Sequence, residues 1–347
     1  MKNVFLLPVL ACAALSASAQ TCQVAGTIKD IGTKPIIFRY TQQGKQHRDT
    51  VRAVNDRFSY AAKPSDDGKI NLQFSPSRFT PFWYEPGKLI VVGNVAQPGE
   101  VSITGTPENN TFDRYKRTIE WKFAQAQQAQ PAAFDGLQAQ EQLATRQFIE
   151  HNASTRTAAE LLYWQMMSND KPIEDYARLL KQLTPAVQQS VQGQAAAKRL
   201  VVLRNQPVIG RVAPDFSIAD TAGTKFSLAS QRGQYVLLDF WGHWCGPCIK
   251  AMPKMKALHA QYTKKLAIIG IAMEDASDAA LWKQAIRKHE IPGLQLSELQ
   301  QANGPVISGY NVTAFPTYML LDRKGIVIAR SNDVDDITKK LSTLTDL

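Results

Sequence analysis

The sequence predicts three folded parts: a small all-β domain, a helical segment, and a C-terminal α/β domain in which helices flank a central mixed sheet. Short apolar runs separated by Gly, Pro, Asn and Asp occupy residues 20–108. Helix-forming residues with little Gly or Pro follow over 109–206. Strand and helix patterns then alternate over 207–347, which is typical of an α/β domain.

The N-terminus, residues 1–19, has the pattern of a signal peptide. Lys2 supplies a positive charge, Val4 to Leu15 is apolar, and Ala17-Ser18-Ala19 offers small residues for cleavage. We therefore expect export to the periplasm or cell envelope. The alternative is a lipoprotein signal that anchors the chain to the membrane at Cys12, because the residues before Cys12 loosely resemble a lipobox.

The β-rich part contains short strand patterns at 35–40, 70–74 and 88–92, and this spacing favours a small sandwich or barrel. Cys22 precedes them, close to the expected cleavage site. We expect a flexible terminal thiol there, with intermolecular pairing as the alternative.

The helical part shows apolar residues at helical spacing, which predicts amphipathic helices. One such stripe consists of Phe112, Tyr115, Ile119 and Phe123. The chain has a net charge of +10, but its Lys and Arg residues are scattered. This distribution favours a solvated surface and argues against a nucleic-acid partner.

In the α/β part, Tyr235 to Trp241 is an apolar strand and the residues from Lys250 to Tyr262 favour a helix. A second strand at 266–272, a helix at 278–289, a hairpin at 318–329 and a final amphipathic helix from 334 follow. The first strand and its helix are joined by the motif that carries the chemistry.

That motif is Trp244-Cys245-Gly246-Pro247-Cys248, a C-x-x-C between a strand and a helix. Cysteines three positions apart at a helix start can form a disulfide. The unpaired N–H groups and the helix dipole favour the thiolate of Cys245, the expected nucleophile. Cys248, one turn further, is the expected resolving thiol. The alternative is half of a zinc site, but the five histidines show no H-x₃₋₅-H spacing.

These residues resemble the thioredoxin fold, and residues 207–347 are similar to its TlpA/ResA-like envelope branch. Pro253 matches a kinking proline in the active-site helix, and Thr313 to Thr317 resembles the loop with the family's cis-proline. The β part is similar to a domain of unknown function that precedes such modules. The resemblance implies that Pro316 faces the dithiol. We expect Trp244 to contact substrate, and we expect Phe315 to do so as an aromatic residue at a position that varies within the family. Packing is the alternative role for Phe315.

Two further positions are candidates for proton transfer. Asp239 lies within an apolar strand, so burial should raise its pKa. The resemblance places it below the resolving cysteine, where it would accept the proton of Cys248; an exposed position at a sheet edge is the alternative. Glu274 and Asp275 occupy the stretch where the family has an acidic residue near the dithiol, or they cap a helix instead. His243 either tunes Cys245 or is a solvated turn residue.

We therefore expect an enzyme, a thiol:disulfide oxidoreductase that exchanges its Cys245–Cys248 pair with cysteines of exported proteins. The Gly-Pro dipeptide resembles that of reducing thioredoxins, so we expect a reductant supplied by an envelope electron donor. No cofactor beyond this disulfide and no metal is expected. The alternatives are a thioredoxin-fold peroxidase and a non-enzymatic envelope binding or assembly module.

Overall fold

The computed structural model describes residues 21–76, 78–168 and 172–345. The expected signal peptide and Cys12 lie outside these residues. The predicted order is confirmed: an all-β part comes first, helices follow, and a mixed sheet with helices completes the chain. Two compact units result. One runs to Gln165 and includes Arg178–Ala196, and the other consists of Met166–Ala177 and the chain from Ala197.

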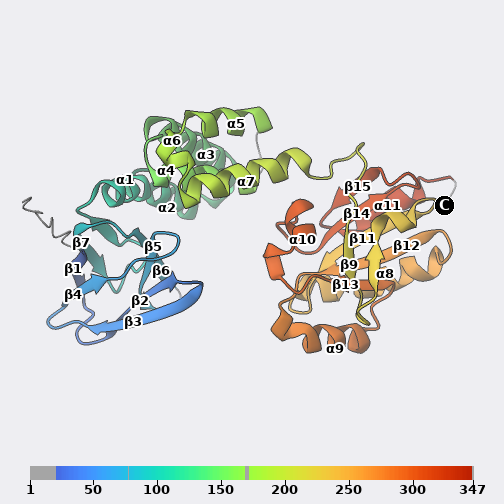
Figure 1. Cartoon of the computed structure of the whole chain (residues 1–347), viewed down its shortest axis with the longest axis horizontal. Helices are drawn as coiled ribbons and strands as arrows, with labels where there is room; N and C mark the ends of the chain where they lie inside the picture. The colour runs from blue at the N-terminus through green and yellow to red at the C-terminus, as the bar shows by residue number, and fades with distance from the viewer. Residues whose placement is uncertain (1–20, 77, 169–171, 346–347) are drawn as a thin grey trace, which may run out of the picture. The chain divides into compact units, whose positions relative to one another are not determined.

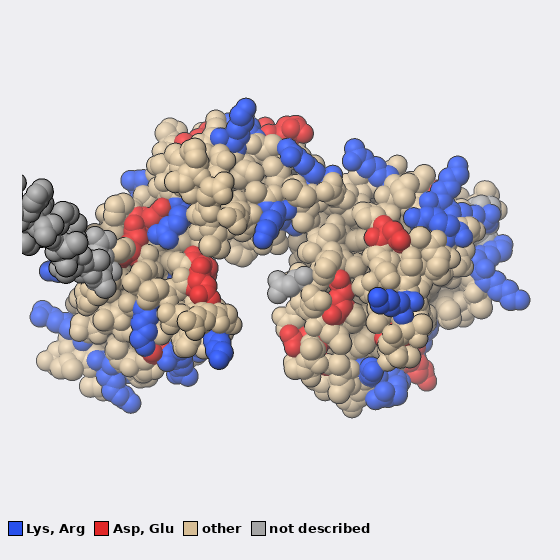
Figure 2. All heavy atoms as spheres, viewed as in Figure 1, with Lys and Arg blue, Asp and Glu red and all other residues tan. Residues whose placement is uncertain are grey.

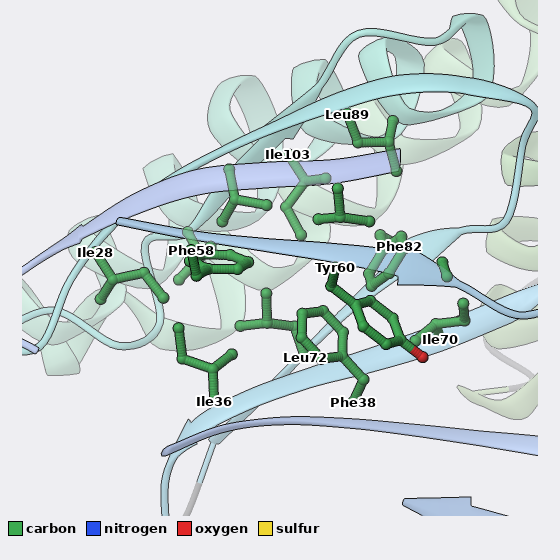
Figure 3. Close-up of a cluster of buried hydrophobic side chains, with 14 of the residues drawn as sticks. Ile28, Ile36, Phe38, Phe58, Tyr60, Ile70, Leu72, Phe82, Leu89 and Ile103 are labelled. Atoms are coloured by element: carbon green, nitrogen blue, oxygen red, sulfur yellow. The ribbon is translucent and has the colours of Figure 1, made fainter. Parts of the chain in front are cut away.

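The all-β part contains two four-stranded sheets, with the orders β4-β1-β7-β8 and β3-β2-β5-β6. Their strands are β1 Cys22–Lys29, β2 Pro35–Gln42, β3 Lys45–Arg52, β4 Arg57–Ala62, β5 Lys69–Ser75, β6 Arg78–Trp83, β7 Gly87–Asn94 and β8 Ser102–Thr104. Residues alternate between buried and exposed along β1 and β4, as expected for strands with one face on a core. The buried faces of both sheets meet in one hydrophobic cluster, so this part is a sandwich (Figure 3).

Cys22 corrects one prediction, because it is not a flexible terminal thiol. It is the first residue of β1 and is 0% exposed. It pairs with Ala62 on β4 and Gly87 on β7, and its side chain belongs to the core of the sandwich. The position of Cys22 close to the N-terminus suggested a mobile backbone. Its pairing with β4 and β7, which lie much later in the sequence, fixes the backbone instead.

The helices that follow include a five-residue π-helix, η1, and a 3₁₀ turn, η2. The segments are α1 Pro107–Tyr115, η1 Lys116–Glu120, α2 Trp121–Ala129, η2 Pro131–Ala133, α3 Phe134–His151, α4 Arg156–Ser168, α5 Ile173–Gln182, α6 Pro185–Gln188 and α7 Val191–Asn205. The predicted stripe is largely buried at Tyr115, Ile119 and Phe123. In the chain segments that the structure describes, no helix has both the length and the apolar character needed to cross a membrane.

The C-terminal sheet has five strands in the order β13-β12-β11-β14-β15, and a small hairpin, β9-β10, precedes it. The strands are β9 Ser217–Ala219, β10 Lys225–Ser227, β11 Tyr235–Trp241, β12 Leu266–Ala272, β13 Leu294–Ser297, β14 Thr317–Leu321 and β15 Val327–Ser331. The helical segments are η3 Leu228–Gln231, α8 Gly246–Gln261, η4 Ala276–Asp278, α9 Ala279–His289, η5 Gln301–Asn303, α10 Pro305–Gly309 and α11 Val334–Ser342.

The apolar strand β11 lies at the centre of this sheet. It is parallel to β12 and antiparallel to β14, so the sheet is mixed as predicted. All seven residues of β11 are buried, because both faces of a central strand are covered. Alternate residues of β11 reach two different cores, one of which includes Met255 and Leu258 of α8. Only residues 242–245 separate the C-terminal end of β11 from the first residue of α8.

Lys and Arg side chains occur on every part of the face seen in Figure 2, with Asp and Glu among them. This distribution is what the scattered positions in the sequence predict. On this face, the distribution of charge therefore gives no indication of a single binding site for a polyanion.

Candidate active site

Cys245 and Cys248 form a disulfide at the start of α8, with 5.3 Å between their Cα atoms. Cys245 is the residue that precedes the first turn, and its sulfur accepts a hydrogen bond from the backbone N–H of Cys248 at 3.2 Å. A sulfur in this position receives the stabilisation that a helix N-terminus offers an anion. Cys245 is 4% exposed and Cys248 is 0% exposed, so Cys245 is the sulfur nearer to solvent.

The disulfide packs against apolar side chains. Its cluster contains Trp241, Met252, Ala272, Trp282 and Ile291. Trp241 is fully buried within this cluster, and its indole N–H donates to Oε1 of Gln295 at 3.0 Å. Gly270 makes room for this contact, since a Cβ atom at Gly270 would overlap the Gln295 amide.

Asp239 lies on β11 under the active-site helix. It is 2% exposed, and its Oδ1 has no hydrogen-bond partner. Burial raises the pKa of Asp239 to about 7. The structure therefore contradicts the alternative of an exposed edge residue.

Strand alternation shows which face Asp239 occupies. It points to the same face of the sheet as Tyr235 and Leu237, which pack against Met255 of α8. Its cross-strand neighbour on β14 is Tyr318, whose hydroxyl is also buried without a partner. Burial and the nearby Asp239 carboxylate both raise the pKa of Tyr318. Asp239 is thus a buried acid with a raised pKa, on the side of the sheet that carries Cys248.

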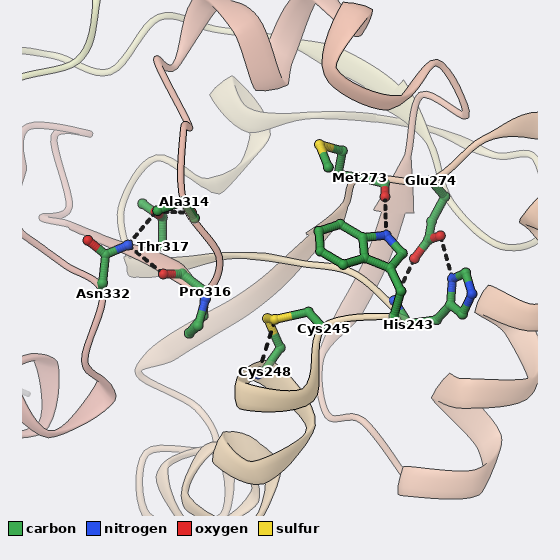
Figure 4. The surroundings of a disulfide bond; sticks show 10 residues. His243, Cys245, Cys248, Met273, Glu274, Ala314, Pro316, Thr317 and Asn332 are labelled. Carbon is green, nitrogen blue, oxygen red and sulfur yellow. Dashed lines mark hydrogen bonds and ion pairs between the residues drawn. A yellow bond between two sulfur atoms is a disulfide. The ribbon is translucent and has the colours of Figure 1, made fainter. Parts of the chain in front are cut away.

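An aromatic rim borders the disulfide. Trp244 is 50% exposed, and its indole N–H donates to the carbonyl oxygen of Met273 at 3.1 Å. The ring of Phe315 packs edge-on against it with 5.6 Å between centroids. The peptide bond between Phe315 and Pro316 is cis, and the Pro316 loop faces the disulfide in Figure 4.

Sequence reasoning missed the residue that holds this loop. The side-chain amide of Asn332 donates to the Pro316 carbonyl oxygen at 2.6 Å and to the Thr317 hydroxyl at 2.9 Å. The Thr317 hydroxyl in turn donates to the carbonyl oxygen of Ala314 at 2.7 Å. An Asn just after a predicted strand was a weak signal, because it is equally common in turns.

Glu274 and Asp275, adjacent in sequence, have different environments. Glu274 is 1% exposed, and its two carboxylate oxygens lie 2.7 Å from the backbone nitrogen and 2.6 Å from Nδ1 of His243. Asp275 turns away and caps η4 by accepting from the backbone N–H of Ser277 at 3.0 Å. The expected helix cap is therefore Asp275, and His243 is not a freely solvated turn residue.

No cluster of three or more His, Cys, Asp or Glu side chains suited to a metal occurs in the parts of the chain that the structure describes. The chemistry that the described residues support is thiol exchange. A sulfur at a helix N-terminus, a second sulfur one turn away and a buried acid on the same side of the sheet are groups that can serve as nucleophile, resolving thiol and proton acceptor in such exchange.

Parts of this chain are similar to known proteins. The model of the AhpC/TSA family matches residues 209–330, and a domain of unknown function, DUF4369, matches residues 22–112. The thioredoxin-like protein YneN of Bacillus subtilis is 36% identical over 131 residues, which are 38% of this chain and 74% of that protein. The thiol-disulfide oxidoreductase ResA of Geobacillus kaustophilus is 32% identical over 141 residues, covering 39% of this chain and 78% of that protein.

Among solved structures, a thiol-disulfide oxidoreductase from Bacteroides fragilis is 31% identical and matches with a TM-score of 0.36, over 38% of this chain and 98% of that one. The matches in sequence confirm the predicted family of the C-terminal part and the predicted likeness of the β part to a domain of unknown function. Through its C-terminal part, the chain belongs to the thioredoxin-like thiol-disulfide oxidoreductases.

Proposed function

We propose that this protein acts outside the cytosol and reduces disulfide bonds in exported proteins. The observation that carries the proposal is the position of Cys245 and Cys248 at the N-terminus of α8, on the same side of the sheet as the buried Asp239. Such a site suits exchange through a mixed disulfide.

In the first step, the Cys245 thiolate attacks one sulfur of a substrate disulfide. A mixed disulfide forms, and the other substrate sulfur leaves as a thiolate. Cys248 then gives its proton to the Asp239 carboxylate and attacks the Cys245 sulfur, which releases the second substrate sulfur. Two electrons pass to the substrate, and the Cys245–Cys248 disulfide remains. An envelope dithiol would return those two electrons.

Substrate binding is assigned to the rim formed by Trp244, Phe315 and Pro316. Trp244 presents an exposed apolar surface beside Cys245, and the loop of Pro316 is fixed by Asn332. An extended substrate segment next to the cysteine could pair with the backbone of this loop, as a strand adds to a sheet edge.

The test is a single-turnover assay with the reduced full-length chain and insulin, whose disulfides are accessible. We expect one insulin disulfide reduced per Cys245–Cys248 pair, no reduction by Cys245→Ser, and accumulation of a mixed disulfide with Cys248→Ser. Absence of insulin reduction by the wild-type chain would contradict the proposal. Hydrogen peroxide is the control substrate, since rapid dithiol-dependent consumption would favour the peroxidase alternative.

Two further experiments address location and substrates. The pattern of residues 1–19 supports export, so fractionation of cells should recover the chain outside the cytosol. If the wild-type chain is found in the membrane fraction and Cys12→Ala is not, the result would favour the lipoprotein alternative. Exported proteins with cysteines should be the partners captured by Cys248→Ser.

A further inference from the structure

The turn between β11 and α8, which contains His243 and Cys245, is hydrogen-bonded to a residue just after β12. Glu274, two residues after β12, receives the backbone N–H of His243 on one carboxylate oxygen and faces the imidazole with the other. The backbone of Glu274 is itself fixed, because its carbonyl oxygen accepts from Gln301 at 2.8 Å. Inside the turn, the N–H of Cys245 donates to Gly242 at 3.0 Å. The carboxylate is thus linked to the nucleophile through a short, continuous set of contacts.

Both oxygens of Glu274 are engaged by His243, and the side chain is inaccessible to solvent. In Figure 4, the Glu274–His243 pair and Pro316 lie on opposite sides of the Cys245–Cys248 disulfide. A group in this position cannot meet a substrate that approaches the disulfide from the Pro316 side. Its effect on the reaction must therefore pass through His243 and the turn.

We propose that Glu274 is a positioning residue for the Cys245 nucleophile, and that it acts through His243. This inference rests on the proposed function, because it assigns Cys245 the first attack. A bond to a charged acceptor is stronger than a neutral one, and two such bonds from one residue fix its backbone as well as its ring. The turn is thereby held where Cys245 begins the helix.

The pair also gives the turn a dependence on pH. The contact between Nδ1 of His243 and the carboxylate is a hydrogen bond only when a proton lies between the two atoms. The imidazole ring can donate that proton to an ionised Glu274, so a change in the protonation of either group changes this hydrogen bond. Burial raises the pKa of Glu274, and the contacts with His243 oppose this effect. The other charge that acts on Glu274 is Asp278 at the end of η4, while the carboxylate of Asp275 is engaged with Ser277.

The experiment measures alkylation of reduced Cys245 by iodoacetamide from pH 5 to 9 in the full-length chain. It compares Glu274→Gln, His243→Ala and the double variant, with Asp275→Asn as the matched control. We expect the plateau rate to fall about tenfold in each single variant and no further in the double variant, because residues that act as a unit are not additive. The control should stay within about twofold of the wild type.

His243→Gln separates positioning from general structure. Its amide can still donate to Glu274 but does not titrate near neutral pH. We expect His243→Gln to keep the wild-type plateau rate of alkylation. The step that the Glu274–His243 pair adds to the wild-type dependence of this rate on pH should be absent in the variant. Additive losses, an unchanged rate in Glu274→Gln, or an equal loss in Asp275→Asn would each overturn the inference.

The alkylation assay needs no protein substrate. Failure of the wild-type chain to reduce insulin would therefore contradict the proposed function and leave the alkylation result interpretable.

Discussion

Replacing Asp239 with Asn should stabilise the oxidised protein and slow its reaction, with a pH dependence that identifies the cause. The carboxyl is almost inaccessible, and its pKa rises from 3.8 to about 7 on folding. At about 1.4 kcal/mol for each pH unit, burial of the charge costs up to about 4 kcal/mol above pH 7. Asn keeps part of the cost of burying a polar group, so we expect a gain of about 2–4 kcal/mol.

The direction in which stability changes with pH follows from proton linkage. Between pH 4 and 7 the folded state holds a proton on Asp239 that the unfolded state has lost, so the stability of the wild type falls as pH rises through this range. Below pH 4 the carboxyl is protonated in both states and carries no such cost. The advantage of Asp239→Asn should therefore be absent at pH 3.5, grow through pH 5 and 6, and become constant above about pH 8.

The assay is calorimetric unfolding of the oxidised chain at several pH values. The transition of the C-terminal part is the one that moves when the Cys245–Cys248 disulfide is reduced. A gain of this size corresponds to roughly 10 °C in Tm for a domain of this length. Asp335→Asn is the control, because the ion pair of Asp335 with Lys254 is half exposed and screened by solvent, so its loss should hardly move the transition.

The kinetic half of the prediction uses mixing of the reduced chain with insulin and acid quenching. Asp239→Asn should slow resolution of the mixed disulfide by about tenfold to a hundredfold and leave the first attack nearly unchanged. Equal stability of variant and wild type at pH 8 would refute the burial argument. Equal slowing of both steps would refute the role of Asp239 as proton acceptor.

Three further outcomes are expected. Cys22 should resist alkylation in the native chain and react only after unfolding, and Cys22→Ser should cost about 1–3 kcal/mol in urea unfolding; rapid labelling of native protein would contradict its burial. Phe315→Ala should lower kcat/KM for insulin severalfold while Trp164→Ala, which removes an exposed ring from α4, should not; equal effects would exclude a specific role for the rim. Burial lowers the pKa of Lys116 to about 8, so the charged lysine destabilises the folded state. Lys116→Met should therefore raise the free energy of urea unfolding by up to about 3 kcal/mol below pH 8, and this gain should vanish near pH 10.5. A gain that does not change with pH would show that burial of the charged lysine has no such cost.

The sequence by itself determined the features that depend on neighbours along the chain. The C-x-x-C between an apolar strand and a helix follows from local spacing. So does β11, whose residues are apolar on both faces except for Asp239, a pattern typical of a strand buried on both sides. The short strands of the β part were equally readable, since alternation and turn residues are local signals. The choice between a sandwich and a barrel depended on how two sheets meet, and the sequence left it open.

Only the tertiary structure decided which distant residues meet. Glu274 and Asp275 are adjacent and chemically similar, yet one is buried against His243, 31 residues away, and the other caps a surface turn. The burial of Cys22 likewise depends on its register with β4 and β7. Local propensity cannot distinguish these outcomes, because successive side chains leave the backbone in different directions and long-range packing selects the one that enters the core.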